Sequence, residues 1–390
     1  MIILAIETSC DDTGVSAIKT GLSKNRKKPI VFNDFEILSE CIFSQAKLHS
    51  KYGGVFPALA KREHQKALIP LLTRTLKNSG LLKENKKDLD NKKILKVKKI
   101  LERNPEIFKD LKEFFKKYAV PEINKIAVTI GPGLEPCLYT GVNLAKALSF
   151  YWNVPVSGVN HIEGHILSSW LSPIEKIEFP AIALVVSGGN TQIILVNNIG
   201  NYKLVGETRD DAAGECFDKT ARILGLEYPG GPIIAKRAKE FKKSKYNISL
   251  PRPMIHDKNY DFSFSGLKTA VLYDYKKRTD EEKTSKEYIN EMAHEIQRAI
   301  IDVLVLKTMR ARKDFKAKSI ILGGGVSANK EMVKEFKKQC KKEKLNCIVP
   351  LTKFSGDNSA MIGLSALISK NVKKTSWQRI KPNSNLKING

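Results

Sequence analysis

The chain has 390 residues and 42% hydrophobic side chains, enough for two domains with buried cores. Its 67 Lys and Arg exceed its 41 Asp and Glu by 26. This surplus favours an anionic partner such as nucleic acid, although lysine-rich drift in genome composition accounts for it equally well. No apolar run approaches the length of a membrane helix, so we expect no membrane partner. The six cysteines are scattered without a C-x-x-C pair, and the first residues resemble a strand rather than a targeting signal, so we expect a cytoplasmic protein.

Two similar strand–turn–strand segments occur in the two halves of the chain. In the first, apolar residues 2–6 precede the polar turn 7–14 and a strand at 15–18, and a further strand is expected at 36–43. In the second, strands at 181–186 and 192–196 flank a turn of small polar residues. The repetition predicts a duplicated domain in which each half presents a turn that can approach a phosphate.

The region after the first hairpin is mainly helical. A turn at 52–57 precedes a helical stripe over 58–76, and we expect His64 on this helix to lie at the surface or to face the substrate. Residues 83–117 are rich in lysine and carry apolar residues at helical spacing on either side of Pro105. This pattern predicts one or two amphipathic basic helices inserted into the domain, either as a solvated decoration or as an arm that contacts RNA or a partner.

A pair of histidines follows a predicted strand, helix and strand at 126–130, 141–151 and 154–159. The segment His161-Ile162-Glu163-Gly164-His165 places two histidines four residues apart. On a helix both imidazoles then face one side and can share a metal ion. The pair alone fits a solvated helix start equally well, because a metal requires a third ligand. The zinc-peptidase motif H-E-x-x-H has its glutamate one position earlier than Glu163, which argues against proteolysis.

Acidic residues of the second half complete the set of polar clusters. Asp211, Glu215 and Asp218 are spaced by four and three, so we expect them on one helix face. There they repel one another unless a ribose, a cation or a basic partner faces them. Asp357, near the start of the last helix, is the candidate third metal ligand. The tail 371–390 has no acidic residue, and we expect it to be flexible.

The motifs, taken together and in order, resemble those of the TsaD family, the tRNA threonylcarbamoyladenosine transferases formerly called O-sialoglycoprotein endopeptidases. They are ETSCDDTG, the GPG loop, HIEGH, VVSGGNTQ, DDAAGECFDKTAR, YPGGP, DFSFSGLKT, GGGVSANK and GDNSAMI. The resemblance covers nearly the whole chain except about 83–120 and the tail. It implies an α/β fold of the duplicated, two-lobed actin/Hsp70/sugar-kinase (ASKHA) type with a ligand cleft between the lobes. The first lobe would span 1–160 and carry the insertion at 83–120; the second would span 161–390, with a last helix that can return to the first lobe.

The resemblance also implies a reaction and its site. Family members transfer the threonylcarbamoyl group from threonylcarbamoyl-AMP to N6 of the adenosine 3′ of the anticodon, in tRNAs that read codons beginning with A. The implied cofactor is one divalent metal ion per subunit, iron before zinc or magnesium, held by His161, His165 and Asp357. Asp11 matches an acidic position near the reacting centre and is the candidate general base. The implied substrate contacts are Val185, Val186, Ser187, Gly188, Gly189, Asp218, Gly231 and Asn329.

One departure from the family and two other functions complete the interpretation. The family usually has a histidine where this chain has Asn190, and an amide can form hydrogen bonds but cannot titrate. The implied partners are tRNA, a TsaB-like paralogous subunit and a TsaE-like ATPase, and the compact N-terminus favours a bacterial-type member. The alternatives are an ATP-dependent kinase or Hsp70-like ATPase on the same scaffold, and a non-catalytic RNA-binding scaffold. The paired histidines argue against the first, and the complete His, His, Asp set argues against the second.

Overall fold

Two five-stranded sheets form the centre of the molecule. The computed structural model describes residues 1–21, 34–85, 88–172, 177–369 and 372–388. Within these ranges the first sheet has the strand order β3-β2-β1-β4-β5, and the second, read from the corresponding edge, has the order β8-β7-β6-β9-β10. The strands are β1 Ile2–Glu7, β2 Asp12–Thr20, β3 Phe35–Ser44, β4 Lys125–Gly131, β5 Val156–Asn160, β6 Ala181–Val186, β7 Thr191–Asn198, β8 Asn201–Glu207, β9 Ser319–Gly323 and β10 Asn346–Ile348.

The two sheets share one topology. β1 pairs antiparallel with β2 and parallel with β4, and β6 pairs in the same way with β7 and β9. The outer pairs repeat as well, because β2–β3 and β7–β8 are antiparallel while β4–β5 and β9–β10 are parallel. The predicted duplication is therefore confirmed, and the chain has the two-lobed α/β fold of the actin/Hsp70/sugar-kinase type.

The first strand of each sheet is buried on both faces. In β1, Ile3 belongs to the core between the sheets, whereas its neighbour Leu4 belongs to the outer core of the first lobe. In β6, Val185 and Val186 divide in the same way between the central core and the outer core of the second lobe. Because successive side chains of a strand point to opposite faces, two buried faces require a continuous apolar run, as both strands have.

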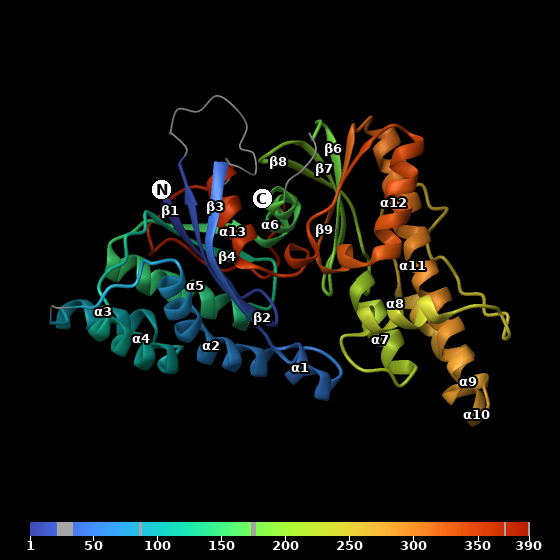
Figure 1. The fold of residues 1–390 in the computed structure, drawn as a ribbon, viewed down its shortest axis with the longest axis horizontal. Coiled ribbons are helices and arrows are strands. Elements are labelled where there is room, and N and C mark those ends of the chain that lie inside the picture. Colours follow the sequence, from blue (N-terminus) through green and yellow to red (C-terminus); the bar gives the residue numbers. More distant parts are fainter. Residues whose placement is uncertain (22–33, 86–87, 173–176, 370–371, 389–390) are drawn as a thin grey trace.

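Helices cover the outer face of each sheet and fill the space between the sheets (Figure 1). The outer helices of the first lobe are α2 Pro57–Asn78, α3 Asn91–Ile100, α4 Pro105–Lys117 and α5 Glu135–Trp152. Those of the second lobe are α7 Ala213–Ile223, α8 Gly230–Glu240, α9 Ser265–Lys277, α11 Lys286–Asp314 and α12 Lys330–Lys342. The central layer holds α6 His161–Leu167 and α13 Ser359–Ile368. The short helices are α1 Ala46–His49, α10 Asp280–Thr284, η2 Ser50–Tyr52, η3 Ser168–Leu171, η4 Gly325–Ala328 and η5 Thr352–Phe354.

The last helix, α13, lies against the first sheet although its sequence follows the second. It packs on β1, β2 and α6. Gly363 allows this approach, because a Cβ atom there would lie 2.6 Å from Cδ1 of Ile18 on β2. Among the residues that the structure describes, none of the helices has the length and apolar composition of a membrane span.

Helix α5 begins earlier than the predicted 141–151. Its first residue is Glu135, and Pro136 follows, a residue that suits a first turn because its missing N–H would have no helical partner. Gly141 is therefore inside the helix and does not begin it. Its role is steric, since a Cβ atom there would lie 2.3 Å from Oγ1 of Thr8 in the first hairpin turn.

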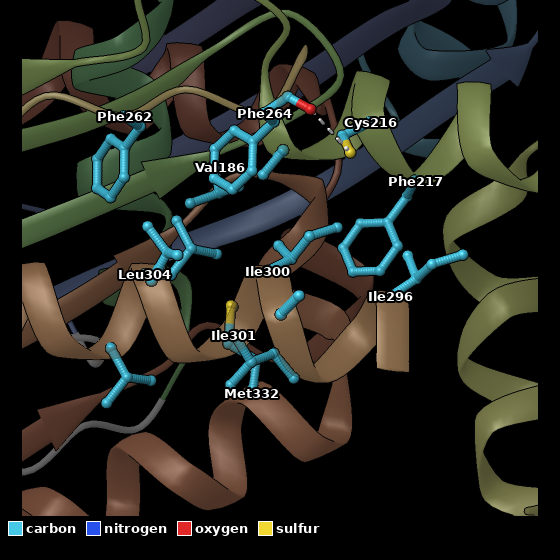
Figure 2. Packing of buried hydrophobic residues seen from close by; sticks show 14 of the residues in the cluster. Val186, Cys216, Phe217, Phe262, Phe264, Ile296, Ile300, Ile301, Leu304 and Met332 are labelled. Atoms are coloured by element: carbon cyan, nitrogen blue, oxygen red, sulfur yellow. Dashed lines mark hydrogen bonds between the residues drawn. The ribbon is translucent and has the colours of Figure 1, made fainter. Parts of the chain in front are cut away.

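Aromatic packing in the second lobe supports the elements that line the cleft. Figure 2 shows Phe217 of α7 and Phe264 beside Ile300 of the long helix α11. The Sγ atom of Cys216 donates to the backbone oxygen of Phe264 over 3.7 Å. Val186 at the end of β6 belongs to the same core, so the turn that follows it rests on a rigid base.

Candidate active site and metal centre

The two histidines are presented by helix α6, which starts where β5 ends. Asn160 caps this helix, because its side-chain oxygen accepts from the backbone N–H groups of Ile162 (2.9 Å) and Glu163 (3.3 Å). The rings of His161 and His165 lie on one side of the helix with their centroids 4.5 Å apart. Both residues are almost completely buried. The predicted spacing therefore does bring the two imidazoles together.

Asp357 approaches both histidines from the loop before α13. Its Oδ1 atom lies 3.5 Å from Nε2 of His161 and 3.1 Å from Nε2 of His165. One ligand atom from each of the three residues lies within 4.8 Å of the others. Both ring nitrogens of His165 are buried without a hydrogen bond of acceptable geometry among the described residues. Two imidazoles and a carboxylate with an unsatisfied buried nitrogen fit a divalent metal ion.

A buried carboxylate, Glu7, orients one of these imidazoles from the end of β1. Its Oε2 atom lies 3.2 Å from Nδ1 of His161 and accepts from Oγ1 of Thr129 (2.5 Å), while Oε1 accepts from the backbone N–H of Ser9 (2.5 Å). A carboxylate bound at Nδ1 keeps the proton on that nitrogen and leaves Nε2 free to bind a metal. Sequence reasoning missed Glu7, although it is the one charged residue at the end of an otherwise apolar strand.

The charges of the cluster are strongly coupled. Burial alone would lower the pKa of His161, but Asp357 and then Glu7 outweigh it and raise that pKa to about 9. Burial opposes ionisation of Asp357, yet the two histidines hold the pKa of Asp357 well below its usual range. Burial, followed by the charge of His161, lowers the pKa of His165. The two carboxylates thus favour a positive charge on His161, and a metal cation bound to this cluster would supply that positive charge instead.

Glu163 lies on the other side of α6 from the metal-ligating atoms. It is buried, and its Oε1 atom accepts from Oγ of Ser369 over 2.6 Å. Burial raises the pKa of Glu163. The carboxylate is therefore engaged in the core and cannot activate a water on the metal as the glutamate of a zinc peptidase does. The prediction from the shifted spacing holds.

The cluster opens into a large cavity of about 2070 Å³ between the lobes. Residues of both hairpin turns line it, together with residues 132–134 of the glycine loop and the start of α12. Predicted site residues that line this cavity are Asp11, His161, Ser187, Gly188, Gly189, Asp218, Gly231, Asn329 and Asp357. Three others do not line it: His165 lies behind His161, and Val185 and Val186 are fully buried in β6.

Backbone packing shapes the second hairpin turn. The N–H of Ser187 donates to the backbone oxygen of Asn190 (2.8 Å), and the N–H of Asn190 donates to Oγ of Ser187 (3.1 Å). Gly214 of α7 lies directly against this turn, because a Cβ atom there would lie 2.4 Å from the oxygen of Ser187. Asn190 thus closes the turn through its backbone, a role that needs no titratable side chain.

Two polar residues fix helix starts on the second-lobe side of the cavity. Asn329 caps α12 by accepting from the N–H groups of Glu331 and Met332, both at 3.1 Å. Asp218 accepts from the N–H of Gly230 at the start of α8 (2.7 Å). Burial raises the pKa of Asp218 to about 6. Helix starts present free N–H groups and a positive dipole end, which suits an anionic or hydroxyl-rich ligand.

The expectation that three acidic residues share one helix face is wrong. Asp211 precedes α7, whereas Glu215 and Asp218 lie within it. Lys219 lies 2.7 Å from Asp211 and 2.7 Å from Glu215. A lysine of the same helix therefore relieves the repulsion that the spacing predicted, and an external cation is not required there.

The first hairpin turn carries two carboxylates into the cavity. Asp11 and Asp12 both line it. Burial, and after it the negative charge of Asp357, raises the pKa of both residues, and that of Asp12 reaches about 7. A carboxylate with a pKa near neutrality can both accept and release a proton, so Asp12 joins Asp11 as a candidate base that sequence reasoning had passed over.

His64 is neither exposed nor open to a substrate, contrary to expectation. It is fully buried in α2. Its Nδ1 atom lies 2.7 Å from Oγ1 of Thr13, and its Nε2 atom lies 2.9 Å from the backbone oxygen of Cys10. Burial lowers the pKa of His64 to about 4, so the ring is neutral. His64 braces the first hairpin turn from behind.

Comparison with known proteins places this arrangement in a family. The family described as "TsaD: tRNA N6-adenosine threonylcarbamoyltransferase" matches residues 36–90 and 105–364. The chain belongs to the TsaD family.

Relatives of the TsaD family match almost the full length of the chain. A tRNA N6-adenosine threonylcarbamoyltransferase of Thermosipho africanus is 37% identical over 98% of this chain and 99% of its own length. Proteins of the same name from Persephonella marina and Bacillus subtilis are 38% and 36% identical, over 94% and 95% of this chain and 89% and 90% of their own lengths.

The inserted region lies partly outside the TsaD family match. The two predicted amphipathic helices are confirmed as α3 and α4, and α3 falls within the unmatched residues 91–104. Helix α4 is part of the core rather than a solvated decoration, since Leu111, Phe114 and Phe115 are buried. Helix α3 covers Tyr151 and Trp377, with Nζ of Lys93 5.8 Å from the Tyr151 ring.

The described part of the tail, residues 372–388, packs against the rest of the molecule, contrary to the expectation of flexibility. The N–H of Asn383 donates to the oxygen of Ile130 (2.7 Å), and Nδ2 of Asn160 donates to the oxygen of Lys387 (3.2 Å). Gly131 makes room for this contact, because a Cβ atom there would nearly coincide with the Asn383 oxygen. Residues 384–387 line the cavity. Sequence reasoning missed this wall because single hydrogen bonds to the ends of β4 and β5 leave no periodic pattern in the tail.

Proposed function

We propose that this chain transfers a threonylcarbamoyl group from threonylcarbamoyl-AMP to N6 of the adenosine 3′ of the anticodon, in tRNAs that read codons beginning with A. Membership of the TsaD family supports this reaction. The observation that carries it in the structure is the meeting of His161, His165 and Asp357 at a cavity lined by both hairpin turns. An amine acceptor and a nucleotide-linked donor both need access to one such centre.

The three ligating residues would hold one divalent metal ion, and we propose iron, with zinc or magnesium as alternatives. Two imidazoles and one carboxylate form a ligand set that iron(II) accepts with positions left open. When bound, the ion supplies Lewis-acid polarisation of a carbonyl oxygen. Glu7 supports the set by holding His161 in the tautomer that frees Nε2.

The nucleotide part of the donor is proposed to lie along the second lobe. Ser187, Gly188 and Gly189 offer a backbone turn without bulky side chains, and β6, with Val185 and Val186, holds that turn in place. The remaining proposed contacts, which come from α7, α8 and α12, are Asp218, Gly231 and Asn329. Their carboxylate, backbone and amide groups suit a ribose and a base.

The proposed chemical step is an acyl transfer. The adenosine N6 nitrogen attacks the carbamoyl carbon, a C–N bond forms, the bond from that carbon to the phosphate oxygen breaks, and AMP leaves. The amine loses one proton in the process. Asp11 is proposed as the base, with Asp12 as a second candidate because its pKa of about 7 suits proton exchange at neutral pH.

The protein partners and the location are proposed from membership of the TsaD family. tRNA and threonylcarbamoyl-AMP are the substrates, and we propose a TsaB-like paralogous subunit and a TsaE-like ATPase as protein partners. The cytoplasm is the proposed location, since uncharged and charged tRNA are found there. We also propose that the lobes divide at residues 160 and 161, between the cap of α6 and its first histidine.

A single-turnover transfer assay tests the proposal. The full chain, the proposed partner subunits, threonylcarbamoyl-AMP and an unmodified tRNA transcript are mixed, and the digested RNA is searched by mass for threonylcarbamoyladenosine. We expect product with the wild type and its loss with His161→Ala. His256→Ala is the matched control, because His256 is exposed and away from the cavity lining. Absence of product with folded, metal-loaded wild type, together with steady ATP turnover in the absence of tRNA, would instead support the ATPase alternative.

A further inference from the structure

Two aromatic side chains are exposed side by side on the first lobe. Tyr52, at the end of η2, is 61% exposed, and Phe56, just before α2, is 57% exposed. Their ring centroids lie 6.3 Å apart with an angle of 27° between the ring planes. A single exposed ring is ordinary, but two adjacent exposed rings form a patch of the kind that marks an interaction surface.

The aromatic pair lies at the rim of the cavity that holds the metal site. Gly53, Gly54 and Val55, which connect the two aromatic residues, line that cavity. A guanidinium nitrogen of Arg222 on α7, in the opposite lobe, lies 3.4 Å from the oxygen of Gly53 and donates to it. In Figure 1 the segment after α1 faces α7 across the space between the lobes. The rings therefore flank a segment that lines the cavity and contacts the opposite lobe.

Buried hydrogen bonds hold the segment that carries the rings and tie it to the reacting centre. His49 is fully buried, accepts at Nδ1 from the N–H of Phe56 (3.4 Å), and lies with Nε2 3.0 Å from Oε1 of Gln45. The side chain of Gln45 donates to the oxygen of Ala60 (3.3 Å), and its backbone N–H donates to the oxygen of Asp11 (3.1 Å). The rings thus stand on a preformed base next to the first hairpin turn.

The charge around the pair fits a polyanion. No acidic residue occurs between Glu40 and Glu63, whereas Lys47, Lys51 and Arg62 in that range are exposed. Exposed π faces among cations are the combination that binds single-stranded nucleic acid, because bases stack on the rings while phosphates contact the cations.

We propose that Tyr52 and Phe56 form a stacking platform for an unpaired base next to the acceptor adenosine in the anticodon loop. This inference rests on the proposed function. A base that enters the cavity must leave its stack, and a platform at the rim offers its neighbour a replacement partner. Ile42 and Phe43 are also exposed on β3, so a protein partner is the competing occupant. The exposed cations of the segment between Glu40 and Glu63, which carries no acidic residue, favour RNA.

A fluorescent base tests the platform directly. An anticodon stem-loop RNA carries 2-aminopurine on either side of the acceptor adenosine, and its fluorescence is followed as the full-length protein is added. Stacking on an aromatic ring quenches this fluorophore, so we expect quenching with the wild type and its loss with the double variant Tyr52→Ala/Phe56→Ala. Tyr273→Ala is the matched control, because Tyr273 on α9 is 60% exposed and does not line the cavity.

Transfer kinetics separate this inference from the proposed function. The double variant should raise the KM for tRNA roughly 10- to 100-fold, the loss expected for removing a base-stacking ring. If the wild type transfers the group and the double variant has the same KM for tRNA, the platform is refuted and the proposed function is not. If the wild type quenches the fluorescence but makes no product, the proposed function is refuted and the platform is not. Absence of quenching by the wild type, or loss of a protein partner instead of RNA by the double variant, would also overturn the platform.

Discussion

Replacing Glu7 by glutamine tests whether the metal centre depends on its buried support. Glu7 uses Oε1 for the N–H of Ser9 and Oε2 for Thr129 and His161. Glutamine keeps the shape but puts an NH₂ group at one of these two positions. An NH₂ group at the Oε1 position would face the N–H of Ser9, so two donors would meet and no hydrogen bond could form. At Oε2 it opposes the proton on Nδ1 of His161, and the ring then escapes the conflict by moving its proton to Nε2, where a metal would bind.

The size of the effect follows from the contacts that are lost. A hydrogen bond to a charged group contributes about 1.5 to 3 kcal/mol. Loss of a partner that orients a metal-ligating histidine lowers metal affinity by roughly 10- to 100-fold. At about 1.4 kcal/mol for each tenfold change, the two figures agree. We therefore expect Glu7→Gln to weaken metal binding by one to two orders of magnitude and to reduce transfer at limiting metal.

The assay is a competition titration of the metal-free protein with a chelator of known affinity. Glu163→Gln is the control, because Glu163 is also a buried carboxylate of the same region but contacts Ser369 and not the histidines. It should leave metal affinity within about twofold, since it touches no ligand. Equal metal affinity in wild type and Glu7→Gln would refute the orienting role of Glu7.

Three further predictions concern stability and the shape of the cleft. Gly214→Ala should abolish transfer without loss of helix content, because its Cβ atom would lie 2.4 Å from the oxygen of Ser187. Gly266→Ala is the control and should be tolerated, because its Cβ atom would lie 3.7 Å from Cγ of Pro253. Transfer assays and circular dichroism check both variants. Burial, and then Asp357, raises the pKa of Asp12 to about 7, so ionising it opposes folding. Ionisation of Asp12 should therefore remove stability from the metal-free protein between about pH 4 and pH 7. Asp12→Asn should lack this contribution, so denaturant unfolding at both ends of that range should show a less favourable change with rising pH for the wild type than for the variant. Phe115→Ala should cost about 3 to 5 kcal/mol in the same assay, and a cost near zero would mean that α4 is only a surface addition.

The strands and turns of this fold are predictable because they leave a pattern in the sequence. Continuous apolar runs mark β1 and β6, and the small polar residues after each run mark the turns that line the cavity. The pairing of His161 with His165 follows from helical spacing alone. Asp357 could be chosen for its place before a predicted helix, but its distance from the histidines depends on how α13 packs against α6, far away in sequence, which no local pattern encodes.

The parts that sequence reasoning missed depend on tertiary contacts. Glu7 looks like the start of a polar turn until Thr129 and His161 are seen beside it. His64 looks like a surface residue of an amphipathic helix until the hairpin turn covers it. The tail looks unstructured because its contacts are hydrogen bonds to the ends of β4 and β5 and widely spaced buried residues such as Ile380 and Ile388, which form no apolar stripe. Such features become visible only when distant segments meet.

The cavity wall formed by residues 384–387 has a consequence for the order in which the cleft is assembled during synthesis. The ribosome adds the first hairpin turn before the histidines of α6, and it adds this wall after both. A nascent chain can thus complete both sheets while the cleft still lacks one side. The Lys387 oxygen also accepts a hydrogen bond from Asn160, the residue that caps α6, so the start of that helix gains this contact only after residue 387 has been added. A chain truncated before residue 384 would retain the three candidate metal ligands but would lack this wall of the cavity.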